Sequence, residues 1–190
     1  MKNLRLFIAI PLEPDLKEVI SKIQSLLKRR NEGVRWVNPE GLHLTLKFLG
    51  NTPQEKVPKI EEAMRKALAP FRPFSVLIKG TGAFPSLKKA RVLWVGIEDK
   101  RSQLKKMFKS LEKHLQKLGF PMEDRPFKPH ITVGRIKNLK SIEFPEGLED
   151  QEVGVLEVKE VILFKSELKP EGAEYHPLIK VSLGGNEDER

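Results

Sequence analysis

The stretch HLTL at residues 43–46 returns 87 residues later as HITV at residues 130–133, and this repeat decides how the chain folds. Each stretch alternates polar and apolar side chains, which is typical of a half-buried β-strand. Because side chains alternate faces with period 2, the histidine and threonine of each stretch share one face, about 7 Å apart, and the two apolar residues share the core face. The sequence therefore predicts two strands that each present an imidazole and a hydroxyl on one side.

The repeat also includes the segments before these strands. The same offset places the apolar run 6–10 on 93–97 without a gap, and the amphipathic segment that begins at Pro14 on the one at 103–118. A strand–helix–strand unit is therefore predicted to occur twice. If the two copies pack about a pseudo-twofold axis, the two histidines and two threonines surround one point of a cleft.

The other periodic segments fit one domain over residues 1–183, with pseudo-repeat halves of about 1–90 and 91–183 and a polar tail at 184–190. Apolar runs and alternation predict strands, and apolar stripes at helical spacing predict helices. Strands are expected at 4–10, 34–37, 42–49, 74–78, 91–97, 127–136, 153–164 and 175–183, and helices at 14–30, 53–68 and 103–118.

Composition limits the function. The 190 residues contain no cysteine, which excludes disulfides, a thiolate nucleophile and any cysteine-ligated metal. Lysine and arginine number 35 against 26 acidic residues, and the net charge of +9 favours a polyanionic partner. No stretch approaches the roughly 18 apolar residues of a membrane-spanning helix, and no secretory signal is recognisable at the start. We therefore expect a cytoplasmic protein with no membrane association.

Two histidines and two threonines around one point suit phosphoryl transfer without a metal or a cofactor. Because histidine titrates near neutrality, one neutral imidazole can act as the base while the other, protonated, acts as the acid. Threonine hydroxyls can donate to the non-bridging phosphate oxygens, where negative charge grows in the transition state. We expect a bell-shaped pH–rate profile with both limbs near neutrality.

The stretches 43–50 and 129–135 resemble the paired H-x-T/S-x signatures of the 2H phosphoesterases. More narrowly, the chain resembles the RNA 2′,3′-cyclic phosphodiesterases, also called 2′-5′ RNA ligases. The resemblance covers nearly the whole chain and includes the opening strand at 6–10 and the segments 91–94 and 126–130. It implies a bilobal, duplicated α+β fold with two antiparallel sheets and outer helices around a central cleft.

The resemblance also implies the reaction and the roles of five residues. The family opens a terminal 2′,3′-cyclic phosphate on RNA to a 2′-phosphate, and the reverse direction joins such an end to a 5′-hydroxyl. Carried over, His130 is the general base that activates water and His43 is the general acid that protonates the leaving 3′ oxygen. Thr45 and Thr132 hold the phosphate oxygens, and Arg135 binds the substrate through its phosphate or a base. The near-symmetry of the two motifs leaves open which histidine is the acid and which the base.

Alternation makes further predictions about the residues that follow the motifs. It places Lys47 on the face of His43 and Phe48 on the core face. It places Arg135 on the core face with Val133, unless the strand bulges at Gly134 and returns the guanidinium to the catalytic face. Both positions of Arg135 stay open at this stage.

Two alternatives to this enzyme also stay open. A non-catalytic RNA-binding protein would keep the fold and the basic surface, and a lone histidine in a strand is usually structural. A related enzyme could act on another cyclic phosphate, such as ADP-ribose 1″,2″-cyclic phosphate. The leading expectation is a monomer that acts on RNA with 2′,3′-cyclic phosphate ends, with tRNA-like fragments among the candidates.

Overall fold

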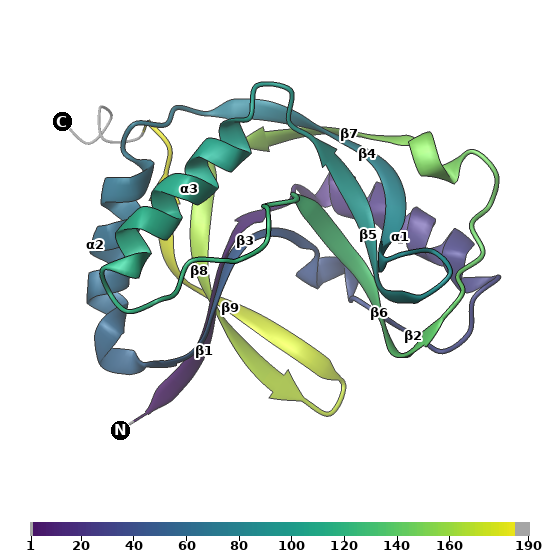
Figure 1. Cartoon of the computed structure of the whole chain (residues 1–190), viewed down its shortest axis with the longest axis horizontal. Helices are drawn as coiled ribbons and strands as arrows, with labels where there is room; N and C mark the ends of the chain where they lie inside the picture. Colours follow the sequence, from purple (N-terminus) through teal and green to yellow (C-terminus); the bar gives the residue numbers. More distant parts are fainter. Residues whose placement is uncertain (1, 185–190) are drawn as a thin grey trace.

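The computed structural model describes residues 2–184, and these residues form two antiparallel sheets with three α-helices outside them (Figure 1). This confirms the predicted fold class. The predicted tail lies outside the described residues except for Gly184. The strands are β1 (Asn3–Pro11), β2 (Val34–Trp36), β3 (His43–Pro53), β4 (Phe74–Pro85), β5 (Ala90–Glu98), β6 (His130–Lys140), β7 (Glu152–Val158), β8 (Glu160–Lys169) and β9 (Gly172–Ser182), and the helices are α1 (Pro14–Lys28), α2 (Val57–Leu68) and α3 (Gln103–Gln116).

Each sheet takes strands from both halves of the sequence. The four-stranded sheet has the order β3-β1-β8-β9, and the five-stranded sheet has the order β2-β6-β5-β4-β7. β2 and β4 therefore leave the first half to join the five-stranded sheet, and β8 and β9 leave the second half to join the four-stranded sheet. Helix α1 packs against β6 and β7, whereas α2 packs against α3 and β9. Neither half of the sequence forms a sheet by itself.

The expected strand at 153–164 is wrong, because the structure divides this segment at Lys159. β7 belongs to the five-stranded sheet and β8 to the four-stranded sheet. Leu156 and Val158 are buried on one side of the break, and Val161 and Leu163 on the other. The step from Val158 to Val161 is odd, which one alternating strand cannot bury on one face.

The two copies of the repeat align in sequence without a gap, but their strands pair in different registers. His43 of β3 lies opposite Pro11, but His130 of β6 lies opposite Gly96, two residues short of the position that an exact repeat requires. Because the slip is two residues and not one, the same faces stay buried. Both motif strands keep their apolar residues in one continuous core that also includes the three helices, with Leu44, Leu46, Ile131 and Val133 among its members.

Each motif strand contains a β-bulge at its second apolar residue. Thr45 lies opposite Ala9 and Lys47 opposite Ile8, so Leu46 is the extra residue on β3. Thr132 lies opposite Trp94 and Gly134 opposite Leu93, so Val133 is the extra residue on β6. A bulge places two consecutive residues against one partner, and the side chains beyond it change faces.

No helix among residues 2–184 is long and apolar enough to cross a membrane.

Candidate active site

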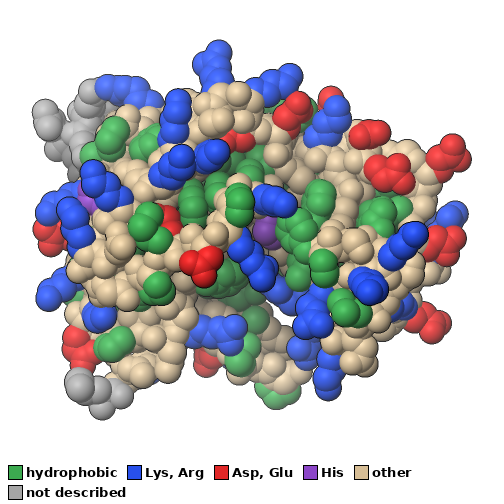
Figure 2. All heavy atoms as spheres, viewed as in Figure 1, with side chains coloured by type: hydrophobic (Ala, Val, Ile, Leu, Met, Phe, Trp, Pro, Cys, Tyr) green, Lys and Arg blue, Asp and Glu red, His purple; other side chains and the backbone are tan. Residues whose placement is uncertain are grey.

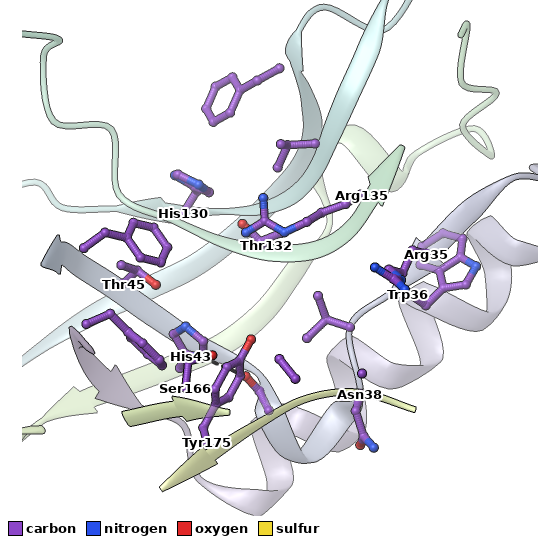
Figure 3. A pocket seen from close by; sticks show the side chains of 18 of the residues that line it. Arg35, Trp36, Asn38, His43, Thr45, His130, Thr132, Arg135, Ser166 and Tyr175 are labelled. Atoms are coloured by element: carbon purple, nitrogen blue, oxygen red, sulfur yellow. Dashed lines mark hydrogen bonds between the residues drawn. The ribbon is translucent and has the colours of Figure 1, made fainter. Parts of the chain in front are cut away.

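A cleft of about 2270 Å³ lies between the two sheets, and residues of both sheets line it. His43 and Thr45 of β3 and His130 and Thr132 of β6 all face this cleft (Figure 3). The predicted group of four is therefore brought together. Figure 2 shows a histidine side chain near the middle of this face, with lysine and arginine side chains beside it.

The two histidines are held in the same way. The Nδ1 atom of His43 lies 2.6 Å from the carbonyl oxygen of Gly41, and that of His130 lies 2.7 Å from the carbonyl oxygen of Lys128. Because a carbonyl only accepts, each Nδ1 carries the proton and donates it. In the neutral imidazoles Nε2 is therefore the unprotonated atom, so it is the one that can exchange a proton with a ligand.

Aromatic side chains fix the two rings. The ring of His43 stacks on Phe7 with 4.8 Å between centroids and meets the edge of Tyr175 at 5.2 Å. His130 meets Phe84 edge to face at 5.0 Å. Gly41 makes room for this packing, because a Cβ atom there would lie 3.1 Å from Cε2 of Tyr175.

Burial lowers the pKa values of both histidines in the free protein. Burial is the largest cause that lowers the pKa of His43 to about 4, and the positive charges of Arg135 and Lys17 lower it further, against the raising effect of its hydrogen bond to Gly41. Burial also lowers the pKa of His130, with a smaller contribution from Arg135. Both imidazoles are therefore neutral at pH 7 before a ligand binds.

The bulge at Val133 decides the position of Arg135. Beyond the bulge the side chain of Arg135 returns to the face of His130 and Thr132, and it lines the cleft (Figure 3). Of the two positions that alternation left open, the structure has the one that requires a bulge.

The bulge at Leu46 makes the prediction for Lys47 and Phe48 wrong. Lys47 turns to the core side, where it is only 3% exposed and forms an ion pair with Glu112 of α3. It also donates to the carbonyl oxygen of Pro121 at 3.0 Å. Phe48 turns to the cleft and is 58% exposed.

Sequence reasoning missed the residues that β2, β8 and β9 contribute. Arg35, Trp36, Ser166 and Tyr175 all line the cleft (Figure 3). Ser166 and Tyr175 lie outside the repeated unit, and Arg35 and Trp36 lie in a strand that the second copy lacks among its described residues. They reach the cleft because β2 pairs with β6, β8 with β1 and β9 with β8.

Comparisons with known proteins agree with this geometry. The model of a family described as LigT-like phosphoesterase matches the chain twice, over residues 10–94 and 95–175. An RNA 2′,3′-cyclic phosphodiesterase of Methanothermobacter thermautotrophicus is 38% identical over 91% of this chain and 95% of that protein. One of Archaeoglobus fulgidus is 36% identical over 92% of this chain and 98% of that protein.

Solved structures have the same fold. A crystal structure of a Thermus thermophilus protein superposes with a TM-score of 0.80 at 30% identity, over 95% of this chain and 98% of that one. Escherichia coli LigT in complex with 3′-AMP superposes with a TM-score of 0.80 at 25% identity, over 96% of this chain and 99% of that one.

Proposed function

The chain belongs to the LigT-like phosphoesterase family, and from this membership we propose that it hydrolyses the 2′,3′-cyclic phosphate at the end of RNA to a 2′-phosphate. The observation that carries the proposal is the pair of imidazoles, each held at Nδ1 by a backbone carbonyl, that face one cleft. The relatives of M. thermautotrophicus and A. fulgidus named RNA 2′,3′-cyclic phosphodiesterase support the substrate class.

The cyclic phosphate lies between the two imidazoles in this mechanism. Nε2 of His130 takes a proton from water, whose oxygen attacks phosphorus. The bond from phosphorus to the 3′ oxygen breaks, and Nε2 of His43 gives its proton to that oxygen. The hydroxyls of Thr45 and Thr132 and the guanidinium of Arg135 donate to the non-bridging oxygens as charge grows on them.

The negative charge of the substrate favours the protonated form that His43 needs as general acid. A phosphodiester anion between the imidazoles favours their protonated forms and raises both pKa values. His43 therefore takes up its proton when the anion binds, against the burial that lowers its pKa to about 4 in the free protein. A 5′-hydroxyl in place of water would attack phosphorus and form a 2′-5′ bond by the same proton transfers.

We also propose that the protein works as a cytoplasmic monomer. The residues that carry the mechanism all come from one chain. RNA ends with a cyclic phosphate are the partner, and tRNA-like fragments are among the candidates.

The test is product analysis with an oligoribonucleotide that ends in a 2′,3′-cyclic phosphate. His43→Ala and His130→Ala are compared with His114→Ala, a matched control on α3 outside the cleft. We expect a 2′-phosphate from the wild type and the control, and loss of at least about a hundredfold in rate in each cleft variant. A 3′-phosphate would contradict the bond assignment. Binding without turnover would favour a non-catalytic RNA-binding protein, and turnover of ADP-ribose 1″,2″-cyclic phosphate alone would favour the other enzyme.

A further inference from the structure

Two arginines lie directly opposite each other next to the proposed reaction centre. Arg35 of β2 pairs with Arg135 of β6, and both side chains line the cleft. Residues directly opposite in antiparallel strands share a face, with Cβ atoms about 5 Å apart, and like charges in such a pair destabilise the sheet. The fold therefore keeps an unfavourable pair of positive charges in this place.

Nothing in the described part of the chain neutralises this pair. Neither Arg35 nor Arg135 forms an ion pair there. Of the three acidic residues that line the cleft, Glu174 pairs with Lys169 at 2.7 Å and Glu123 lies 3.9 Å from Lys47. The third, Glu171, forms no ion pair with either arginine in the described part of the chain. An anion from outside the protein is the group that would compensate both charges.

The backbone around the two arginines is fixed by buried contacts. The buried side-chain amide of Gln24 donates to the carbonyl oxygens of Val37, at 2.8 Å, and of the bulged Val133, at 3.0 Å. Gly134 lets β2 approach closely, because a Cβ atom there would lie 2.7 Å from Cγ1 of Val34. The pair thus stands on a rigid part of the fold, as a binding site requires.

The order of side chains along the cleft indicates the ligand. Figure 3 shows His130, Thr132, Arg135 and Arg35 in sequence along β6 and β2, with Arg35 farthest from the histidines. Two guanidiniums offer ten N–H donors in planar forks, which match the oxygens of a phosphate. On an RNA chain whose cyclic end lies at the histidines, the next anion along the backbone is the neighbouring internucleotide phosphate.

We propose that Arg35 and Arg135 bind this internucleotide phosphate and that the enzyme thereby selects an RNA chain over a free nucleotide. The inference rests on the proposed function, because that function places the cyclic end at the histidines. Arg135 stands between the two phosphates, and Arg35 contacts the second one alone. Phosphate contacts of this kind position the chain without reading its sequence.

Calorimetry with two product analogues tests the site without turnover. The ligands are a diribonucleotide with a 2′-phosphate and the same compound with an uncharged methylphosphonate linkage. We expect the wild type to bind the charged linkage about tenfold more tightly, and Arg35→Gln to reduce this preference to about twofold. Arg35→Lys keeps the positive charge but loses the planar fork of N–H donors. Its preference for the charged linkage should therefore lie between those of the wild type and Arg35→Gln.

The matched control is Arg29→Gln, which removes the same charge from an exposed position at the end of α1 outside the cleft. It should keep the tenfold preference. A wild type without preference, an undiminished preference in Arg35→Gln, or an equal decrease in Arg29→Gln would overturn the inference. A thermal melt of each variant checks folding, and Arg35→Lys serves if Arg35→Gln fails to fold. A wild type that shows the preference yet hydrolyses no cyclic end would contradict the proposed function and support this site.

Discussion

At the scale of single residues, the two histidines are chemically alike but not electrostatically alike. Each donates from Nδ1 to a carbonyl two residues earlier in the chain, so the hydrogen bonds do not distinguish acid from base. Their surroundings distinguish them, because His43 also stacks on Phe7 and its pKa is lowered by a second cation, Lys17. The difference between the two roles is therefore expected to come from burial and charge.

The lowered pKa values predict the pH dependence. Because kcat/KM reports the free enzyme, a pKa of about 4 for His43 and a lowered pKa for His130 place its optimum below pH 6.5. The profile of kcat should lie at higher pH, since bound phosphate raises both pKa values. Arg135→Gln removes a cation that lowers both, so its kcat/KM optimum should move up. Rates from pH 4 to 9 check this, and a flat profile or a wild-type kcat/KM optimum above pH 7.5 would contradict it.

At the scale of elements, the two bulges determine which side chains reach the cleft. Alternation predicted the faces of His43, Thr45, His130 and Thr132, because these residues precede the bulges. It failed for Phe48 and its neighbour Lys47. A bulge depends on the register with β1 or β5, and that register is set by long-range pairing that local periodicity does not report.

The exposure of Phe48 gives the first test at this scale. Phe48→Ala should lower the free energy of unfolding by less than about 1 kcal/mol, because the ring is 58% exposed. A phenylalanine in the core would cost about 3–5 kcal/mol. Urea unfolding measures the free energy of unfolding of both proteins. A loss of about 3–5 kcal/mol would place Phe48 on the core face.

The buried ion pair between Lys47 and Glu112 gives the second test at the scale of elements. It joins β3 to α3, and Glu112 also accepts from the backbone amide of Glu123, at 2.6 Å, in the segment that leads to β6. Removing one partner leaves an uncompensated buried charge, so Lys47→Met should destabilise the fold by about 3–5 kcal/mol. Lys47→Met combined with Glu112→Leu should recover most of that loss in urea unfolding. Additive losses in the double variant would mean that the two charges do not interact.

At the scale of the whole molecule, the exchange of strands between the sequence halves makes the two sheets interdependent. β1 requires β8 as its second neighbour, and β4 requires β5. The repeat in the sequence could be found without the structure, because it lies in strand and helix periodicity. The exchange of strands could not be found in this way. Only the odd spacing from Val158 to Val161 shows in residues 153–164 that the chain crosses between sheets at Lys159.

We therefore predict one cooperative unfolding unit over residues 1–183. Calorimetry should give a single transition whose calorimetric and van't Hoff enthalpies agree. A fragment of residues 1–90 should show no folded circular dichroism signal, since β1, β2 and β4 lose partners from the other half. Two separate transitions, or a folded fragment, would mean that the halves are independent domains.

The central claim is that His130 acts as the general base and His43 as the general acid. A substrate with a sulfur in place of the 3′ oxygen tests it most directly. A thiolate leaves without a proton because a thiol is far more acidic than an alcohol, with a pKa of about 8.5. We predict that this 3′-thio cyclic phosphate restores His43→Ala to within about tenfold of the wild type, because the general acid is no longer needed. It should not restore His130→Ala, which still lacks the base. Restoration of His130→Ala instead, or of neither variant, would contradict the account.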